Sequence, residues 1–207
     1  SRAAQAFTQT MPDGSRIGYF IGDGTGVGKG RQIAGTILHL WNSGVKQIVW
    51  VSYNETLLND AKRDLEGLGM KLPVRWLGDI KLKHDIKTKM PEGIVFTSYS
   101  TLASMAADDK QRTDVGFVPF RRVRQILDWA GPDTAIVFDE AHRCLAASYE
   151  KLADAYPHAR VLGLTAPPYR QDGQGLGSRY DHMLVVCQPP ELIADGFISK
   201  PVTYGIP

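Results

Sequence analysis

Short apolar runs alternate along the chain with longer amphipathic stretches. The apolar runs are rich in β-branched and aromatic residues, a composition typical of strands. They cover Ile17–Ile21, Gln47–Ser52, Val74–Leu77, Gly93–Thr97, Thr134–Phe138, Arg160–Leu164 and His182–Cys187. Several of them are apolar almost throughout, as expected of strands that are buried on both faces of a sheet.

The segments between these runs have helical periodicity. In Glu55–Leu68 the apolar residues recur on one face, and Asn54 stands at the position of an N-cap. The other predicted helices are Lys29–Trp41, Phe120–Ala130, Cys144–Tyr156 and Pro190–Asp195. Strands that alternate with helices imply right-handed crossovers and a sheet covered on both faces. The predicted fold class is therefore α/β, with a mainly parallel sheet.

Length and composition narrow the class of protein further. With 207 residues, 43% hydrophobic and 22% charged, the chain is long enough to bury a core as one domain. No apolar run approaches the ~18 residues that a membrane helix needs. Its two cysteines, Cys144 and Cys187, lack the spacing of a zinc site or a disulfide framework, which favours an intracellular setting, in the cytoplasm or nucleoid.

The net charge of +2, from 24 basic and 22 acidic residues, is too even for a protein that binds nucleic acid by bulk charge. Any contact with nucleic acid must therefore be local. Two sets of basic residues are interpreted as solvated surface rather than as such a contact. They are Lys81, Lys83, Lys87 and Lys89, and Arg121, Arg122 and Arg124.

A glycine-rich segment, Gly22–Gly30, joins the first predicted strand to the first long helix. Glycines let backbone N–H groups approach phosphate oxygens, and a lysine at the helix start reaches the β- and γ-phosphates of a nucleotide. The predicted nucleotide-binding residues are Gly24, Thr25, Gly26, Val27, Gly28, Lys29, Gly30 and Arg31.

Two positions of this segment depart from the general phosphate-loop pattern. Asp23 stands where the first glycine belongs, and Gly30 stands where a hydroxyl would bind Mg²⁺. Three consequences are possible for the metal: a water takes the ligand position, Thr25 contributes, or binding is weaker than usual.

The predicted strand Thr134–Phe138 runs into two adjacent carboxylates, Asp139 and Glu140. A buried parallel strand would bring both to the carboxyl edge of the sheet, beside the phosphate loop. There Asp139 would hold Mg²⁺, and Glu140 would deprotonate the water that attacks the γ-phosphate. The alternative is that the pair caps the following helix.

Three motifs follow one another along the chain: the phosphate loop, then Asp139-Glu140-Ala141-His142, then Thr165-Ala166. In this order of motifs the chain resembles the first motor domain of superfamily-two helicases. The regions Gly14–Gly35 and Trp129–Gly131 resemble strawberry-notch-type helicases, whose phosphate loop also reads GVGKG. The stretch Asp139–Pro201 is similar to phage and bacterial DEAD/DEAH-box helicases. A natural intermediate branch and an engineered splice near Asp139 are both compatible with this mixture.

The resemblance implies a P-loop NTPase fold of the RecA-like type, a three-layer α/β/α sandwich that covers residues 1–207. Residues 1–14 would be a truncated leader, and residues 201–207 would begin a linker to a missing second RecA-like domain. ATP and Mg²⁺ are the implied cofactors, with Lys29 and Glu140 catalytic and Asp139 at the metal. His142, Thr165 and Ala166 would couple hydrolysis to movement of the second domain, although Pro167 replaces the threonine usual in this motif.

Two segments resemble the motifs by which helicases track a strand, and a helix N-terminus with hydroxyls is a natural seat for phosphate. Their candidate nucleic-acid residues are Ser52, Asn54, Ser98, Tyr99 and Ser100. The resemblance favours DNA over RNA. The leading prediction is an ATP-binding motor domain of a DNA helicase or translocase. The alternatives are a nucleotide-gated binding module without motor activity and, less favoured, a small-molecule P-loop kinase.

Overall fold

The structure is a computed structural model. It describes Pro12, residues 18–23, 28–105, 120–141, 147–155 and 159–165, Tyr180, and residues 182–185 and 189–196. The strands are β1 (Tyr19–Ile21), β2 (Gln47–Ser52), β3 (Val74–Trp76), β4 (Gly93–Ser98), β5 (Ala135–Asp139), β6 (Arg160–Leu164) and β7 (His182–Leu184). The helices are α2 (Lys29–Asn42), α3 (Leu57–Glu66), α4 (Ile86–Lys89), α5 (Tyr99–Leu102), α6 (Arg121–Trp129), α7 (Ala147–Asp154) and α8 (Pro189–Ala194), with a 3₁₀ turn, η1 (Leu77–Asp79).

The strands form one sheet in the order β3-β4-β2-β5-β6-β1-β7, and every pairing between them is parallel. The α/β fold class is thereby confirmed. Because the strands run in the same direction, their carboxyl ends meet at one edge of the sheet. In register, Ser52 of β2 lies beside Ser98 of β4, and Asp139 of β5 lies beside Leu164 of β6.

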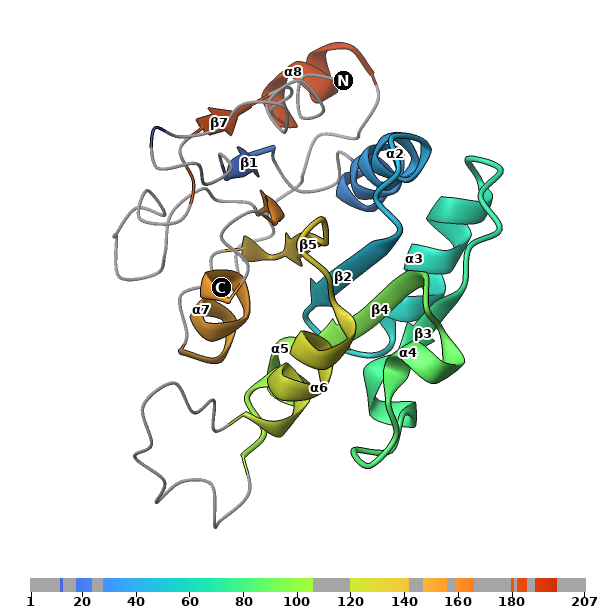
Figure 1. Cartoon of the computed structure of the whole chain (residues 1–207). Coiled ribbons are helices and arrows are strands. Elements are labelled where there is room, and N and C mark those ends of the chain that lie inside the picture. Colours follow the sequence, from blue (N-terminus) through green and yellow to red (C-terminus); the bar gives the residue numbers. More distant parts are fainter. Residues whose placement is uncertain are drawn as a thin grey trace, which may run out of the picture.

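Helices cover both faces of this sheet (Figure 1). Side chains alternate along each strand, so Ile48 and Trp50 of β2 join one core cluster while Val49 and Val51 join the other. The first cluster contains apolar residues of α2 and α3. The second contains residues of α4, α5, α6 and α7. These two cores on opposite faces of one sheet make the predicted three-layer sandwich.

The sequence predictions differ from the structure mainly at helix ends and in short elements. The N-cap prediction for Asn54 is wrong: α3 begins at Leu57, and the Asn54 Oδ1 atom accepts a hydrogen bond of 2.6 Å from the Thr56 hydroxyl instead. The helices α4 and α5 have four residues each and were not predicted, because a single turn is too short to display helical periodicity. Among the described residues, no helix combines the length and the apolar character of a membrane span.

Candidate functional site

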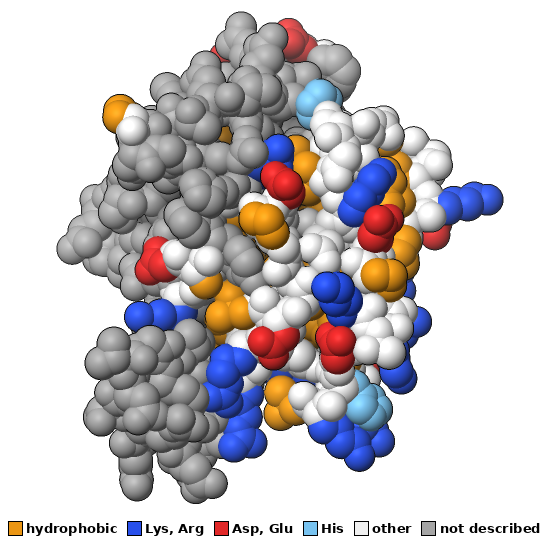
Figure 2. Space-filling model, in the orientation of Figure 1, with side chains coloured by type: hydrophobic (Ala, Val, Ile, Leu, Met, Phe, Trp, Pro, Cys, Tyr) orange, Lys and Arg blue, Asp and Glu red, His pale blue; other side chains and the backbone are white. Residues whose placement is uncertain are grey.

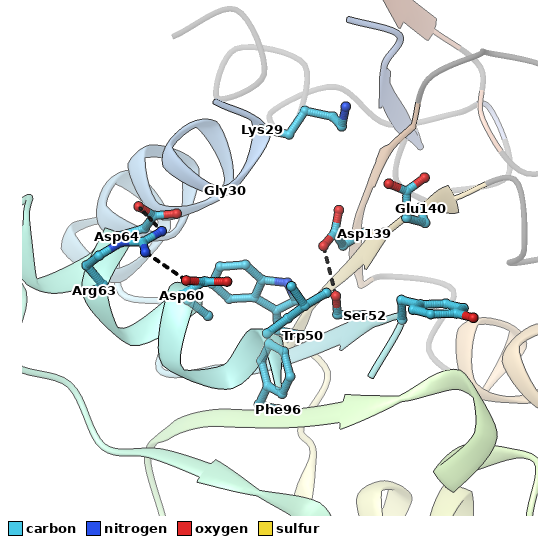
Figure 3. A pocket seen from close by; sticks show the side chains of 13 residues that line it. Lys29, Gly30, Trp50, Ser52, Asp60, Arg63, Asp64, Phe96, Asp139 and Glu140 are labelled. Atoms are coloured by element: carbon cyan, nitrogen blue, oxygen red, sulfur yellow. Dashed lines mark hydrogen bonds and ion pairs between the residues drawn. The ribbon is translucent and has the colours of Figure 1, made fainter. Parts of the chain in front are cut away.

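The carboxyl edge of the sheet brings together segments that lie far apart in the sequence. A cavity of about 530 Å³ opens there, and Lys29, Asp139 and Glu140 are at its rim. Figure 3 shows the Lys29 side chain reaching over the space above the two carboxylates, with residues of α3 on the opposite side. The floor is aromatic, formed by Trp50 of β2 and Phe96 of β4. This arrangement combines a cation, two carboxylates and a pocket.

The end of the phosphate loop has the geometry of a helix start. Gly28 has a φ of 75°, in the left-handed region that favours glycine, and its carbonyl accepts the first hydrogen bonds of α2, from the amides of Arg31 and Gln32. Lys29 is therefore the first residue of α2. The nucleotide-binding predictions for Gly24, Thr25, Gly26 and Val27 lie outside the described residues.

The departure at position 23 has a structural explanation. The Asp23 side chain is buried, and its Oδ2 atom accepts a hydrogen bond of 2.8 Å from Gln32 Nε2, in the first turns of α2. This bond ties the beginning of the loop to the helix that follows it. A glycine at this position would leave the loop without that anchor. The Nε atom of Arg31, another predicted nucleotide-binding residue, pairs with Asp64 of α3 at 3.6 Å.

Asp139 is held at the end of β5 by its neighbour on β2, since the Ser52 hydroxyl donates a hydrogen bond of 2.8 Å to Asp139 Oδ2. Burial raises the pKa of the Asp139 carboxyl, and the negative charge of Glu140 raises it further; the bond from Ser52 and the charge of Lys29 act in the opposite direction. A largely buried carboxylate of this kind is a suitable partner for a divalent cation. Asp139 therefore fits the role of magnesium ligand.

We expect this buried carboxyl to make the metal-free protein less stable as the pH rises. A carboxyl whose pKa is higher in the folded than in the unfolded chain binds its proton more tightly when folded, so the free energy of unfolding falls as pH rises above the ordinary value of 3.8. Asp139→Asn removes this titration. In urea denaturation with a chelator present, the stability of the variant relative to the unmodified chain should increase between pH 4 and pH 7. Asp128→Asn, at an exposed position on α6, is the control, and a pH-independent difference for Asp139→Asn would contradict the expectation.

Glu140 has an unusual backbone, with a φ of 59°. A left-handed conformation at a residue with a side chain costs on the order of 1–3 kcal/mol, and surrounding contacts have to maintain it. Two neighbours make these contacts. The Tyr99 hydroxyl donates to the carbonyl oxygens of Asp139 and Glu140, at 2.7 and 3.3 Å, and the Thr165 hydroxyl donates to Glu140 Oε2 at 3.3 Å. Tyr99, at the start of α5, thus holds the backbone at Glu140, and Thr165, directly after β6, holds its carboxylate.

The predicted nucleic-acid residues fall into two groups. Ser52, Ser98 and Tyr99 are buried, and their hydroxyls make hydrogen bonds inside the domain: Ser98 caps α5 by accepting from the Thr101 amide at 3.2 Å. Asn54 is partly exposed and Ser100 exposed. Beside Asn54, Tyr53 has 52% of its surface exposed, the most exposed aromatic side chain among the described residues.

Sequence reasoning missed the hydrogen bonds of Tyr99 to the backbone carbonyls of Asp139 and Glu140, because no periodicity or motif indicates which backbone atoms a hydroxyl will reach. Of the three predicted coupling residues, Thr165 lies at the end of β6 beside Glu140. His142 and Ala166 lie outside the described residues.

The two sets of basic residues, one in the segment after β3 and the other on α6, form a single surface away from this cavity. Gln125 Nε2 of α6 donates to the carbonyls of Lys81 and His84, and Arg122 Nη1 donates to the carbonyl of Leu77, so α6 fixes the segment after β3. A polar hollow of about 470 Å³ lies between them, lined by Lys83, Arg121 and Arg124 among others. In Figure 2, Lys and Arg side chains gather at the lower edge of the molecule.

The chain matches the family described as "P-loop containing NTP hydrolase pore-1" over residues 1–165, a match that continues past the acidic motif to the end of β6. It is 33% identical over 183 residues to Protein FORGETTER 1 of Arabidopsis thaliana, with 79% of this chain and 13% of the relative covered. It is 38% identical over 149 residues to Protein strawberry notch of Drosophila melanogaster (68% and 8% covered), and 39% identical over 175 residues to human strawberry notch homolog 2 (79% and 12% covered). The chain thus spans between 8% and 13% of the length of these relatives.

A solved structure with the same fold is the helicase domain of Hef from Pyrococcus furiosus. It superposes with a TM-score of 0.59 at 17% sequence identity, over 83% of this chain and 35% of that one. The family match, the relatives and the shared fold agree with the arrangement of the phosphate-loop helix and the acidic strand at one sheet edge. The chain therefore belongs to the P-loop containing NTP hydrolase pore-1 family, is similar in sequence to the strawberry notch proteins, and shares the fold of a helicase domain.

Proposed function

We propose that this domain binds Mg-ATP, hydrolyses it, and uses the cycle to move on DNA together with a second RecA-like domain. The observation that carries the proposal is the position of Glu140. The residue has a left-handed backbone conformation and lies between Thr165, which follows β6, and Tyr99, which follows β4. A catalytic base linked to a candidate nucleic-acid segment is an arrangement expected of a nucleic-acid-dependent ATPase.

The chemical roles follow from the groups at the cavity. Lys29 would offset the charge of the β- and γ-phosphates, and Glu140 would orient and deprotonate the attacking water. Asp139 would hold Mg²⁺, which when bound neutralises charge on the phosphates. Backbone amides at the start of α2 add the partial positive charge of a helix N-terminus. His142, Thr165 and Ala166 are proposed to pass the change at the γ-phosphate to the second domain.

We further propose that the second domain completes the catalytic site. In related P-loop enzymes an arginine supplied from outside the phosphate-binding domain contributes about 10³- to 10⁵-fold to the rate. The domain alone should therefore bind Mg-ATP weakly and hydrolyse it slowly. DNA as the partner implies an intracellular setting.

Tyr53 provides a test of the nucleic-acid contact. Its exposed ring lies at the carboxyl end of β2, next to Asn54, and is proposed to stack on a base of single-stranded DNA. Losing such a stack costs about 1–3 kcal/mol per base, which corresponds to roughly a 5- to 150-fold increase in Kd. We expect this change for Tyr53→Ala in fluorescence anisotropy with a labelled oligothymidine.

The control is Leu82→Ala, which removes another exposed apolar side chain, 47% exposed, from the segment after β3. It should leave the Kd for the oligonucleotide unchanged. Equal effects of the two substitutions would show that Tyr53 makes no specific contact with the strand.

ATP turnover with and without single-stranded DNA tests the proposed function as a whole, in a protein that contains this domain and the second one. A motor requires turnover that DNA stimulates, together with strand separation or translocation that stops without ATP. Bound nucleotide without turnover would instead support the alternative of a nucleotide-gated binding module. Phosphoryl transfer to a metabolite would support a small-molecule kinase.

A further inference from the structure

Gly30 raises the question of which group takes the place of the missing hydroxyl. In the phosphate-loop pattern, the residue after the lysine carries a Ser or Thr hydroxyl that binds Mg²⁺. The side chain at this position therefore points toward the metal. In this chain the position has no side chain, yet the space that a side chain would enter is filled.

The group in that space is a carboxylate of α3. A Cβ atom built on Gly30 would lie 2.3 Å from Asp64 Oδ2 and 3.5 Å from its Cγ atom. Only 14% of the Asp64 side chain is exposed, and its other oxygen, Oδ1, faces Arg31 at 3.6 Å and Arg63 at 3.8 Å. The two arginines hold the carboxylate by one oxygen while the second oxygen is directed at Gly30.

Asp64 and Asp139 line the same cavity, on opposite sides of it (Figure 3). A second observation indicates that this cavity receives a polar ligand. Trp50, which is 2% exposed, lines the floor, and its indole Nε1 atom has no hydrogen-bond partner among the described residues. A buried N–H without an acceptor costs about 1–3 kcal/mol, so an oxygen from water or phosphate is expected above the indole.

Magnesium chemistry fits these groups. Mg²⁺ demands an octahedral shell of oxygens, usually keeps several waters, and is bound through one or two carboxylates together with the phosphates. A metal-bound water donates hydrogen bonds, so it needs an acceptor beside it. A water in the place of the Ser/Thr hydroxyl would lie within hydrogen-bonding reach of Asp64 Oδ2, because that oxygen borders the space that the side chain of residue 30 would fill.

We propose that Asp64 replaces the hydroxyl missing at Gly30 by accepting a hydrogen bond from a water bound to the Mg²⁺ of the nucleotide complex. The proposal rests on the nucleotide site of the proposed function and extends it to α3. It makes Asp64 a positioning residue for the hydrated metal. It also accounts for the glycine: a serine at position 30 would collide with the carboxylate that takes over its role.

The affinity of this chain for ADP is measured by calorimetric titration, once with magnesium chloride and once with a chelator. The ratio of the two affinities is the magnesium enhancement. Loss of a group that orients a metal ligand typically weakens metal affinity by about 10- to 100-fold, so Asp64→Ala should reduce the enhancement by a factor in this range. The affinity for metal-free ADP should stay unchanged, which also verifies that the variant is folded.

The matched control is Asp60→Ala, one turn earlier on α3. Asp60 lines the same cavity, but its carboxylate pairs with Arg63 at 2.7 Å. This substitution removes the same charge from the same helix and should leave the magnesium enhancement intact. Equal losses for Asp60→Ala and Asp64→Ala would indicate an effect of overall charge and overturn the proposal.

A rescue of the magnesium enhancement is a stricter test of the proposal. Gly30→Ser in the Asp64→Ala background restores a hydroxyl where the carboxylate no longer blocks it, and should recover the magnesium enhancement; Gly30→Ser alone should not increase it. An Asp64→Ala chain with the unmodified enhancement overturns the proposal and leaves the nucleotide site in place. An unmodified chain that binds ADP under neither condition would refute both this proposal and the proposed function.

Discussion

Replacing Glu140 by glutamine is expected to lower ATP turnover by about 10²- to 10⁴-fold, the range that general-base catalysis contributes. The amide cannot accept the proton of the attacking water. It keeps the size of the carboxylate, and its oxygen can still accept the hydrogen bond that the Thr165 hydroxyl donates at 3.3 Å. Binding of Mg-ATP should therefore persist, because the proposed phosphate ligands are Lys29 and the backbone at the start of α2.

Phosphate release at saturating ATP and single-stranded DNA, in a protein with both motor domains, measures this effect. Glu66→Gln, at an exposed position near the end of α3, is the control and should turn over at the unmodified rate. Nucleotide binding measured in parallel separates lost chemistry from lost affinity. If Glu140→Gln retained more than a tenth of the turnover, another residue would have to be the base.

The second large effect concerns stability and is expected at Trp129. The residue is 2% exposed and belongs to the core cluster between the sheet and α6. Its indole Nε1 atom donates a hydrogen bond of 2.7 Å to the Met90 carbonyl, so it connects α6 to the segment that enters β4. Truncation of a buried aromatic residue to alanine typically costs about 3–5 kcal/mol. This is a large part of the ~5–15 kcal/mol by which a domain is stable.

Urea denaturation of Trp129→Ala and Trp129→Phe tests the assignment. The phenylalanine variant keeps most of the apolar volume and leaves the Met90 carbonyl without its donor, which costs about 1–3 kcal/mol. We therefore expect the order of stability to be the unmodified chain, then Trp129→Phe, then Trp129→Ala. A loss below about 1 kcal/mol for Trp129→Ala would contradict the packing described for this residue, since cavity formation costs more than that.

The strands and longer helices were predictable from the sequence because their signals are local. A buried parallel strand is apolar over several consecutive residues, as Ile48–Val51 is, and a helix of two or more turns repeats its apolar face, as α2 does. The single-turn helices α4 and α5 carry no such repeat. Helix starts were less predictable, since Asn54 is a good capping residue by type but bonds Thr56 instead.

For the candidate site, the sequence predicted the location but not the hydrogen-bond partners. The fold class places the ends of parallel strands at one edge, so the sequence alone assigns Asp139 and Glu140 to the neighbourhood of the phosphate loop. The partners that hold them could not be assigned in this way. Ser52 and Tyr99 were predicted to contact nucleic acid, whereas their hydroxyls bond to Asp139 and, for Tyr99, to the carbonyl of Glu140 as well. Such choices depend on distances of about 3 Å between different strands.

The sequence by itself therefore determined the α/β class, the phosphate loop and the acidic strand end, because hydrophobic periodicity and short motifs are properties of neighbouring residues. Only the tertiary structure decided how the two departures from the phosphate-loop pattern are accommodated. Asp23 is anchored by Gln32, nine positions away, and Gly30 leaves space for a carboxylate of another helix, at Asp64. Both depend on which side chains packing brings within hydrogen-bonding distance, and no local pattern encodes that.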